Sequence, residues 1–79
     1  MDNIYIPLNS LSIGEKCKVK KLMSEGLTRR RLLDLGLIDN TIVEPLHQSP
    51  SGDPIAYFIR GAVIALRSDV ASMVLVEKL

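Results

Sequence analysis

The sequence has few of the side chains on which small domains often depend for stability or chemistry. Its 79 residues include one cysteine, one histidine and no tryptophan. A single cysteine excludes a disulfide within the chain, and two soft ligands are too few for a structural zinc site. Stability must therefore come from packing, for which a hydrophobic content of 47% is sufficient. We expect one domain, residues 1–79, because a second would be too small to bury its own core.

The chain also lacks an excess of charge of one sign and a long apolar run. A net charge of +1 argues against a general polyanion binder, and two tyrosines and one phenylalanine offer few stacking platforms for bases. The longest aliphatic run, residues 62–66, is far shorter than the roughly 20 residues that span a bilayer. The N-terminal residues do not have the pattern of a secretory signal. We therefore predict a soluble cytoplasmic protein with no nucleic-acid partner, and a free thiol suits that compartment.

What is present is mostly short strands. Between residues 15 and 23, Cys17 and Val19 alternate with lysines, which is the pattern of a half-buried strand with lysines on its outer face. Cys17 is interpreted as a buried, small hydrophobic side chain rather than a nucleophile or a ligand. A second strand is predicted at 41–48, where Pro45 lacks a ladder donor and indicates an edge or a bulge.

The stretch SPSGDPIAYFIRG, residues 49–61, predicts two turns around one strand. Ser49 to Gly52 fit a type I turn, and Asp53 before Pro54 favours an extended entry into the next strand. The apolar runs 55–59 and 62–66, joined by Arg60-Gly61, indicate a hairpin. The residues expected to shape turns across the whole chain are Gly36, Gly52, Asp53, Pro54 and Gly61.

The segment LTRRRLLDLGL, residues 27–37, has a helical period. Thr28 is the expected N-cap and Gly36 the residue that ends the helix, with Leu32 and Leu37 as the apolar pair of a Schellman motif. A further helical turn at 68–72, with Ser68 as its cap, precedes a last strand at 73–77. The order predicts a mainly β fold: a small barrel of about five strands with one short helix and a one-turn helix.

No catalytic constellation is visible. His47 stands near Glu44 and Asp53 in the sequence, but its spacing matches no metal-binding motif, and it is interpreted as a polar residue at a strand end. No serine lies in a nucleophile elbow, and the glycines are scattered singly rather than in a phosphate-binding loop. We predict no enzymatic activity, no cofactor and no metal site.

The most unusual local feature is Arg29-Arg30-Arg31. With Thr28 as cap, the arginines fill the first helical turn, where the macrodipole disfavours cations by a few tenths of a kcal/mol each. One interpretation is a solvated surface in which Asp34 compensates Arg30; the other is an acidic or phosphate-bearing partner.

The helical leucines leave two interpretations open as well. Leu32, Leu33 and Leu35 span an arc of about 160° on a helix, so either all three pack inward or one faces solvent. An exposed leucine beside the arginines would form a protein-docking patch. The candidate partner-binding residues are Arg29, Arg30, Arg31, Leu32 and Leu33.

Together these segments resemble the FeoA family of bacterial ferrous iron uptake. The resemblance is carried by residues 29–37, 49–61 and 65–76, with LSIGEKCKVKKL at the start, and covers residues 8–76. It implies an SH3-like β-barrel and a non-enzymatic adaptor that acts with FeoB, the membrane transporter with a cytosolic GTPase domain. The membrane would then be reached only through the transporter. Many relatives have Pro-Gly before the second strand, where this chain has Asp39-Asn40.

Three alternatives stay open from the sequence. An arginine of residues 29–31 could stimulate the transporter's GTPase. The barrel is also similar to the carboxy-terminal domain of iron-dependent repressors, which would make it an interaction or regulatory module. A weak homo-oligomer formed through apolar edges is the third.

Overall fold

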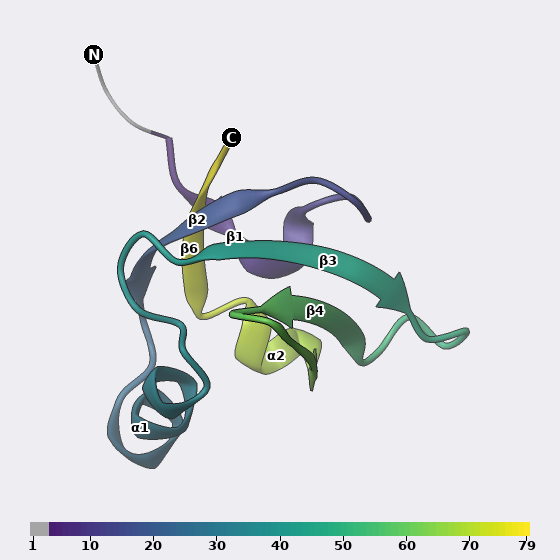
Figure 1. Ribbon diagram of the computed structural model, residues 1–79. Helices are drawn as coiled ribbons and strands as arrows, with labels where there is room; N and C mark the ends of the chain where they lie inside the picture. The colour runs from purple at the N-terminus through teal and green to yellow at the C-terminus, as the bar shows by residue number, and fades with distance from the viewer. Residues whose placement is uncertain (1–3) are drawn as a thin grey trace.

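The computed structural model describes residues 4–79, which form a mainly β fold with short helical segments (Figure 1). The predicted mainly β architecture is confirmed. The strands are β1 (Ile6–Pro7), β2 (Cys17–Leu22), β3 (Ile42–Gln48), β4 (Ile55–Ile59), β5 (Ala62–Leu66) and β6 (Val74–Lys78). The helical segments are the 3₁₀ turn η1 (Leu8–Ser10), α1 (Gly26–Asp34) and α2 (Ser68–Ala71).

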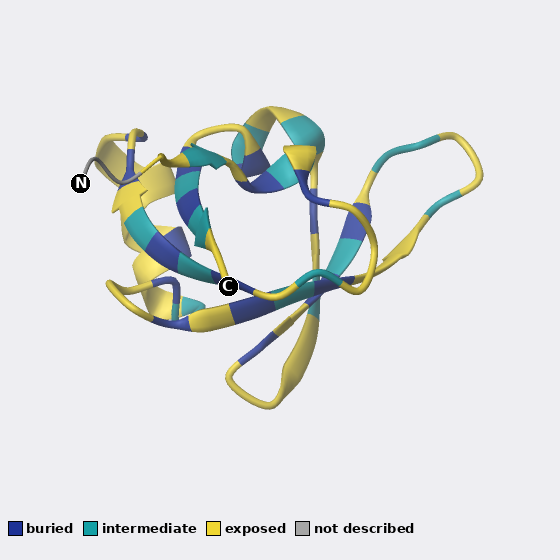
Figure 2. Cartoon of the chain, turned by 90° about the horizontal axis from the view of Figure 1, so that it is seen from above, coloured by how far each residue is buried: buried dark blue, intermediate teal, exposed yellow. Residues whose placement is uncertain are grey.

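All the strands belong to one antiparallel sheet in the order β1-β6-β2-β3-β4-β5. The sheet curls around a centre lined by buried residues, while its exposed turns project outward (Figure 2). Within residues 4–79 no ladder joins β1 to β5, so the barrel is open between these two strands. The strand missing from the sequence prediction is β1, which has only two residues and shows no alternation.

One apolar cluster fills the concave side of the sheet. The alternating residues of β2 and β4 point into it, and Leu8 of η1 and Leu32 of α1 are buried in it as well. Tyr57 is its largest fully buried side chain. The buried members are Leu8, Leu11, Cys17, Val19, Leu22, Leu32, Leu37, Val43, Ile55, Tyr57, Ile59, Leu66, Ala71, Val74 and Val76.

The β4–β5 hairpin follows the predicted turn chemistry. Ile59 pairs with Ala62 across a two-residue loop, and both loop residues have positive φ, 48° at Arg60 and 85° at Gly61. This is the geometry of a type I′ turn, whose twist matches that of the flanking strands. Asn40 likewise takes a φ of 70°, so Asp39-Asn40 keeps the left-handed turn expected of it.

Asp53 links the β3–β4 turn to α2. The turn closes through the Gly52 N–H, which donates to the Ser49 carbonyl at 2.8 Å. Asp53 Oδ1 then accepts from the backbone N–H of Ser68 at 2.8 Å and from its hydroxyl at 3.3 Å. The expectation that Ser68 caps α2 is wrong. Ser68 is the first residue of the helix, and its backbone N–H donates to the Asp53 carboxylate. A residue expected only to shape a turn therefore also fixes a helix start.

Pro45 accounts for an irregularity in β3. The β3–β4 register shifts between Pro45 and His47, so a bulge lies where the sequence indicated an edge or a bulge. The Pro45 carbonyl accepts from the Gly14 N–H at 2.8 Å, and the Pro45 side chain is buried.

Candidate partner-binding surface

Helix α1 begins at Gly26, two residues before the predicted cap at Thr28. The expectation of a Thr28 N-cap is therefore wrong: Thr28 lies inside the first turn, and no side chain caps the helix start. The early start brings Leu27 into the helix, where it is 88% exposed. Sequence reasoning missed Leu27 as a surface residue because it placed that leucine before the helix.

The same correction moves the arginines further along the helix. Arg29 is the fourth helical residue rather than the first after the cap, and Arg31 falls in the last turn, where the macrodipole favours a cation. The electrostatic cost expected for three arginines in the first turn is therefore reduced. Arg30 and Asp34 also form no ion pair within 4 Å in the described part of the chain, because none of its salt bridges involves α1.

The end of α1 is fixed by a Schellman motif. The Leu37 N–H donates to the Leu32 carbonyl at 3.1 Å and the Gly36 N–H to the Leu33 carbonyl at 3.0 Å. Gly36 has a φ of 101°, and side-chain carbons of Arg60 occupy the place that a Cβ at Gly36 would need. Gly36 therefore serves both the left-handed turn and the close approach of the β4–β5 turn.

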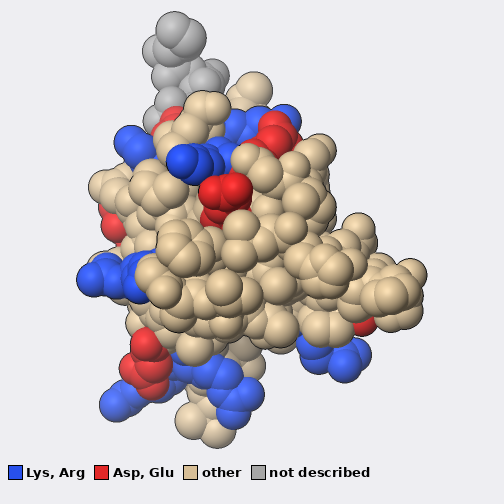
Figure 3. All heavy atoms as spheres, turned by 45° about the vertical axis from the view of Figure 1, so that its right-hand side comes forward, with Lys and Arg blue, Asp and Glu red and all other residues tan. Residues whose placement is uncertain are grey.

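The three arginines point in different directions around α1. Arg29 Nη1 donates to the Leu22 carbonyl at 3.3 Å, and its side chain lines a hollow beside β2. Arg31 lines the opposite flank, facing β5. Arg30 and Arg31 form no side-chain hydrogen bond with the described residues. Basic side chains gather at the lower end of the molecule, where α1 lies, beside acidic ones (Figure 3). Two of the three guanidinium groups are thus available to a partner.

The leucines of α1 divide between core and surface. Leu32 is buried and Leu35 is partly buried against the core, whereas Leu33 is 38% exposed. The interpretation in which all three pack inward is therefore wrong. Leu33 lines the hollow beside β2, and Leu27 and Leu32 line the opposite flank. An apolar side chain thus accompanies an arginine on each flank of α1.

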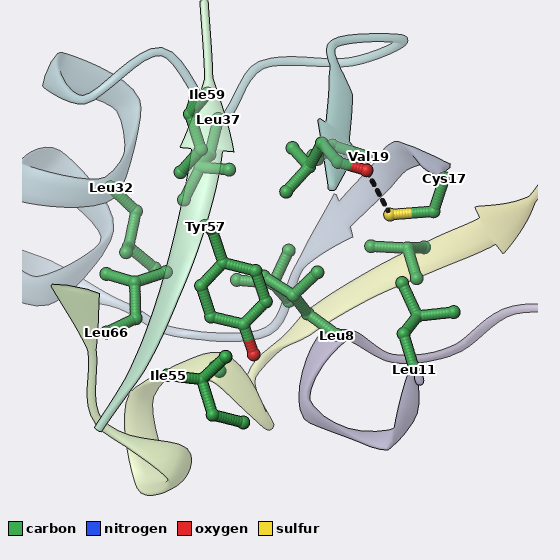
Figure 4. Packing of buried hydrophobic residues seen from close by; sticks show 14 of the residues in the cluster. Leu8, Leu11, Cys17, Val19, Leu32, Leu37, Ile55, Tyr57, Ile59 and Leu66 are labelled. Atoms are coloured by element: carbon green, nitrogen blue, oxygen red, sulfur yellow. Dashed lines mark hydrogen bonds between the residues drawn. The ribbon is translucent and has the colours of Figure 1, made fainter. Parts of the chain in front are cut away.

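The larger of these hollows lies between α1 and β5, and we call it the α1–β5 groove. Its volume is about 430 Å³ and its apolar floor is formed by α1, β5 and α2. Leu32 and Leu66 lie next to each other at the floor (Figure 4). Sequence reasoning found only its α1 side. The lining residues are Leu27, Thr28, Arg31, Leu32, Leu35, Ile64, Ala65, Leu66, Arg67 and Val70.

The single cysteine and the single histidine of the chain lie away from this surface, and the cysteine is a core residue. Burial raises the pKa of the Cys17 thiol to about 11, and its Sγ–H donates to the Val43 carbonyl at 3.4 Å, which suits an inert core residue (Figure 4). His47 is exposed on β3. Residues 4–79 contain no group of three or more His, Cys, Asp or Glu side chains arranged to hold a metal ion. No helix in that range has the length and apolarity needed to cross a membrane.

A family model described as the FeoA domain matches residues 6–78, almost the whole chain. The chain belongs to the FeoA domain family. The match includes residues 29–37, 49–61 and 65–76 and the opening LSIGEKCKVKKL, the segments on which the resemblance was based. This family is linked to ferrous iron transport.

The relatives support both the family and the fold. A FeoA-like protein from Clostridium acetobutylicum is 37% identical, with a TM-score of 0.89 over 100% of this chain and 91% of that chain. The chain is also 26% identical over 70 residues to the Fe(2+) transport protein A/Fe(2+) transporter FeoB fusion protein of Porphyromonas gingivalis. That match covers 89% of this chain but spans only 8% of the fusion protein.

More distant structures agree in fold alone. Stenotrophomonas maltophilia FeoA complexed with zinc, described as a procaryotic SH3 domain protein, is 23% identical with a TM-score of 0.80, covering 94% of this chain and 89% of that chain. The SH3-like architecture implied by the resemblance is therefore confirmed. A manganese-dependent transcriptional repressor is 18% identical with a TM-score of 0.87, covering 100% of this chain and 44% of that chain. The fold is thus shared with repressors, as the sequence suggested.

Proposed function

We propose that this chain is a non-enzymatic, cytoplasmic accessory of ferrous iron uptake that binds the cytosolic, GTPase-bearing region of a FeoB-type transporter and modulates its assembly or activity. The observation that supports this most is the Porphyromonas gingivalis fusion, in which a similar segment and a FeoB transporter belong to one chain. Segments that are fused in one organism often associate when they are separate chains in another. The proposal therefore reaches the membrane only through the transporter.

The proposed docking surface is α1. It combines exposed apolar side chains, Leu27 and Leu33, with guanidinium groups at Arg30 and Arg31 that have no described partner within the chain. Arginine and a central apolar anchor are the residue types that contribute most at protein interfaces. The guanidinium groups would guide an acidic partner surface, and the apolar side chains would supply most of the affinity.

The experiment is an amide NMR titration of this protein with detergent-solubilised transporter. We expect shifts and broadening concentrated at residues 26–37. The variant Arg30→Glu should weaken binding by about tenfold, since it reverses a charge at a steered interface. Lys78→Glu is the matched control, because Lys78 is exposed and adjacent to the C-terminus, at the opposite end of the molecule from α1 (Figure 1).

The possible outcomes distinguish failure of the proposed docking surface from failure of the proposed function. Equal affinity of Arg30→Glu and Lys78→Glu would exclude α1 as the docking surface. Absence of any shift with saturating transporter would overturn the adaptor function itself. A change in the transporter's GTP turnover that Arg30→Glu or Arg31→Glu abolishes, while binding persists, would instead favour the GTPase-stimulating role.

A further inference from the structure

Strand β5 is an exposed edge without the usual protection. It ends the sheet and pairs only with β4 among the described residues. Its five residues, AVIAL, include no charge and no proline, and Val63 is 64% exposed. Edge strands of soluble proteins are usually blunted by charges, proline, bulges or extreme shortness, because an open edge pairs with other chains. β5 has none of these devices.

The free hydrogen-bonding groups of β5 belong to Val63 and Ala65. Ile59 pairs with Ala62 across the two-residue turn, so Ala62, Ile64 and Leu66 direct their backbone groups toward β4. The backbone groups of Val63 and Ala65 therefore face away from β4. No hydrogen bond from residues 4–79 reaches them.

The α1–β5 groove runs along this same edge. Ile64 and Leu66 line it with their inward-facing side chains, and Ala65 lines it too although its side chain alternates to the other face. The edge of the strand thus borders the groove. A strand added to β5 would place every second side chain between β5 and α1, over Leu32 and Leu35.

The charges at the groove indicate what kind of strand fits. Arg31 lines it from α1 and Arg67 from the end of β5. Arg67 has one weak exposed partner, Asp69, at 3.6 Å. No acidic residue within 4–79 lines the groove. A peptide with carboxylates flanking apolar residues would be complementary to it.

We propose that the free edge of β5 binds an extended, acidic segment of a partner protein as an additional antiparallel strand, with its alternate apolar side chains in the α1–β5 groove and its carboxylates at Arg31 and Arg67. The inference rests on the proposed function only in identifying the protein that carries this segment. It adds a mode of recognition, strand addition, to a surface otherwise described by side chains alone.

A second copy of this chain fits the edge less well. Antiparallel pairing of two β5 strands through Val63 and Ala65 centres on Ile64 and sets Arg67 of each copy opposite Gly61, next to Arg60, of the other. Like charges would then meet at both ends of the new ladder, which is unfavourable. An acidic segment meets the same arginines with the opposite sign.

The test uses a synthetic peptide, Glu-Glu-Val-Thr-Val-Thr-Val-Glu-Glu with blocked ends, titrated into the full chain. We expect amide shifts at residues 63–66 and at Arg31, and slower hydrogen exchange at the Val63 and Ala65 amides. A peptide with lysine in place of glutamate should bind about tenfold more weakly, because its charges oppose the arginines. A peptide N-methylated at alternate amides should lose binding by about tenfold or more, because main-chain hydrogen bonds supply the affinity of an added strand.

Variants of the chain test the edge directly. Val63→Pro removes an N–H that faces outward and leaves the β4–β5 ladder intact, so it should weaken peptide binding by about tenfold. Val63→Thr, which keeps the N–H, should bind within about twofold of the wild type. If Val63→Pro does not fold, the N-methylated peptide carries the test alone.

Three results would overturn the proposal. The first is the absence of amide shifts at about 2 mM peptide, and the second is equal binding of the N-methylated and unmodified peptides. The third is protection of the Val63 and Ala65 amides from hydrogen exchange that increases with protein concentration when no peptide is present, which would assign the edge to a second copy. Transporter that binds Val63→Pro normally but not Arg30→Glu would reject strand addition and keep the proposed function.

Discussion

The two edges of the sheet, β1 and β5, are constructed in opposite ways. β1 has two residues, and one of them is Pro7, which has no N–H to offer. The Pro7 carbonyl is already bonded by the Ser10 hydroxyl at 2.7 Å. The chain then turns at once into η1 and buries Leu8 completely. Little hydrogen-bonding capacity remains at this edge.

β5, in contrast to β1, keeps free backbone hydrogen-bonding groups. It has five residues in regular register with β4, and its outward backbone groups at Val63 and Ala65 have no described partner. It borders a groove rather than a packed turn. Because one edge of the same sheet is protected and the other is not, the open edge is better explained by a binding function than by a general tolerance of exposed edges.

The largest expected effect comes from truncating one buried leucine to alanine next to each edge, Leu8 just after β1 and Leu66 in β5. Leu8 is completely buried, so Leu8→Ala should lower the free energy of unfolding by about 3–4 kcal/mol through lost burial and a cavity. Leu66 is buried but lines the groove, so Leu66→Ala leaves a smaller enclosed cavity and should cost about 2 kcal/mol. Urea denaturation measures both. An equal or larger loss at Leu66 would mean that the β5 edge is packed as firmly as the β1 edge.

Alkaline pH probes the shared core of the sheet through two buried groups on different strands. Burial raises the pKa of Cys17, on β2, from 9.0 to about 11, and that of Tyr57, on β4, from 10.0 to about 12. Above each ordinary pKa the unfolded chain releases a proton that the folded chain keeps, so stability falls as pH rises. The loss from Cys17 begins at about pH 9 and that from Tyr57 at about pH 10, and each lowers the free energy of unfolding by about 3 kcal/mol in all.

Two variants separate these contributions in urea denaturation at several pH values. Cys17→Ala should delay the onset of the loss by about one pH unit, to the range in which Tyr57 acts. Tyr57→Phe should remove the later part and keep the early onset. A loss that begins at the same pH in wild type and Cys17→Ala would contradict the assignment of the early step to the thiol.

Asp53, in the β3–β4 turn, provides a smaller test, because it bonds to Ser68 just beyond the end of β5. Because it accepts from both the N–H and the hydroxyl of Ser68, Asp53→Ala should lower the free energy of unfolding by about 1–2 kcal/mol. Asp53→Asn keeps an acceptor oxygen and should cost about half as much. Hydrogen exchange at the Ser68 amide reports the local effect. Equal losses for the two variants would show that the charge of Asp53, rather than the hydrogen bond, holds α2 to the β3–β4 turn.

How far the sequence predicted this fold depended on local chemistry. The bounds of β4 and β5 were predicted correctly because both apolar runs end at Arg60-Gly61, which only a tight hairpin turn explains. The Schellman end of α1 was predicted because Gly36 and the leucine spacing specify it. β1 was not, since two residues that include Pro7 carry no periodic signal and form a strand only because β6 is beside them.

The candidate surface was predicted only in part, because it is made by tertiary contacts. Thr28 matched the usual cap preference, yet α1 starts earlier, so Leu27 and the three arginines stand at other helical positions than the sequence predicted. Arg67 and Ile64 belong to the groove only because β5 folds back beside α1. No local sequence pattern predicts that proximity. In the same way, the sequence predicted the role of Asp53 in the turn but not its hydrogen bond to Ser68.

The smallest expected effect comes from placing lysine on each edge. Ile6 of β1 is partly buried against the core, so Ile6→Lys should lower the free energy of unfolding by about 1 kcal/mol. Val63 is mostly exposed, so Val63→Lys should change it by less than about 0.5 kcal/mol. Urea denaturation of the two variants measures both changes in the free energy of unfolding. A clear loss at Val63 would show that the β5 edge is already covered within this chain, and the contrast between the two edges would then disappear.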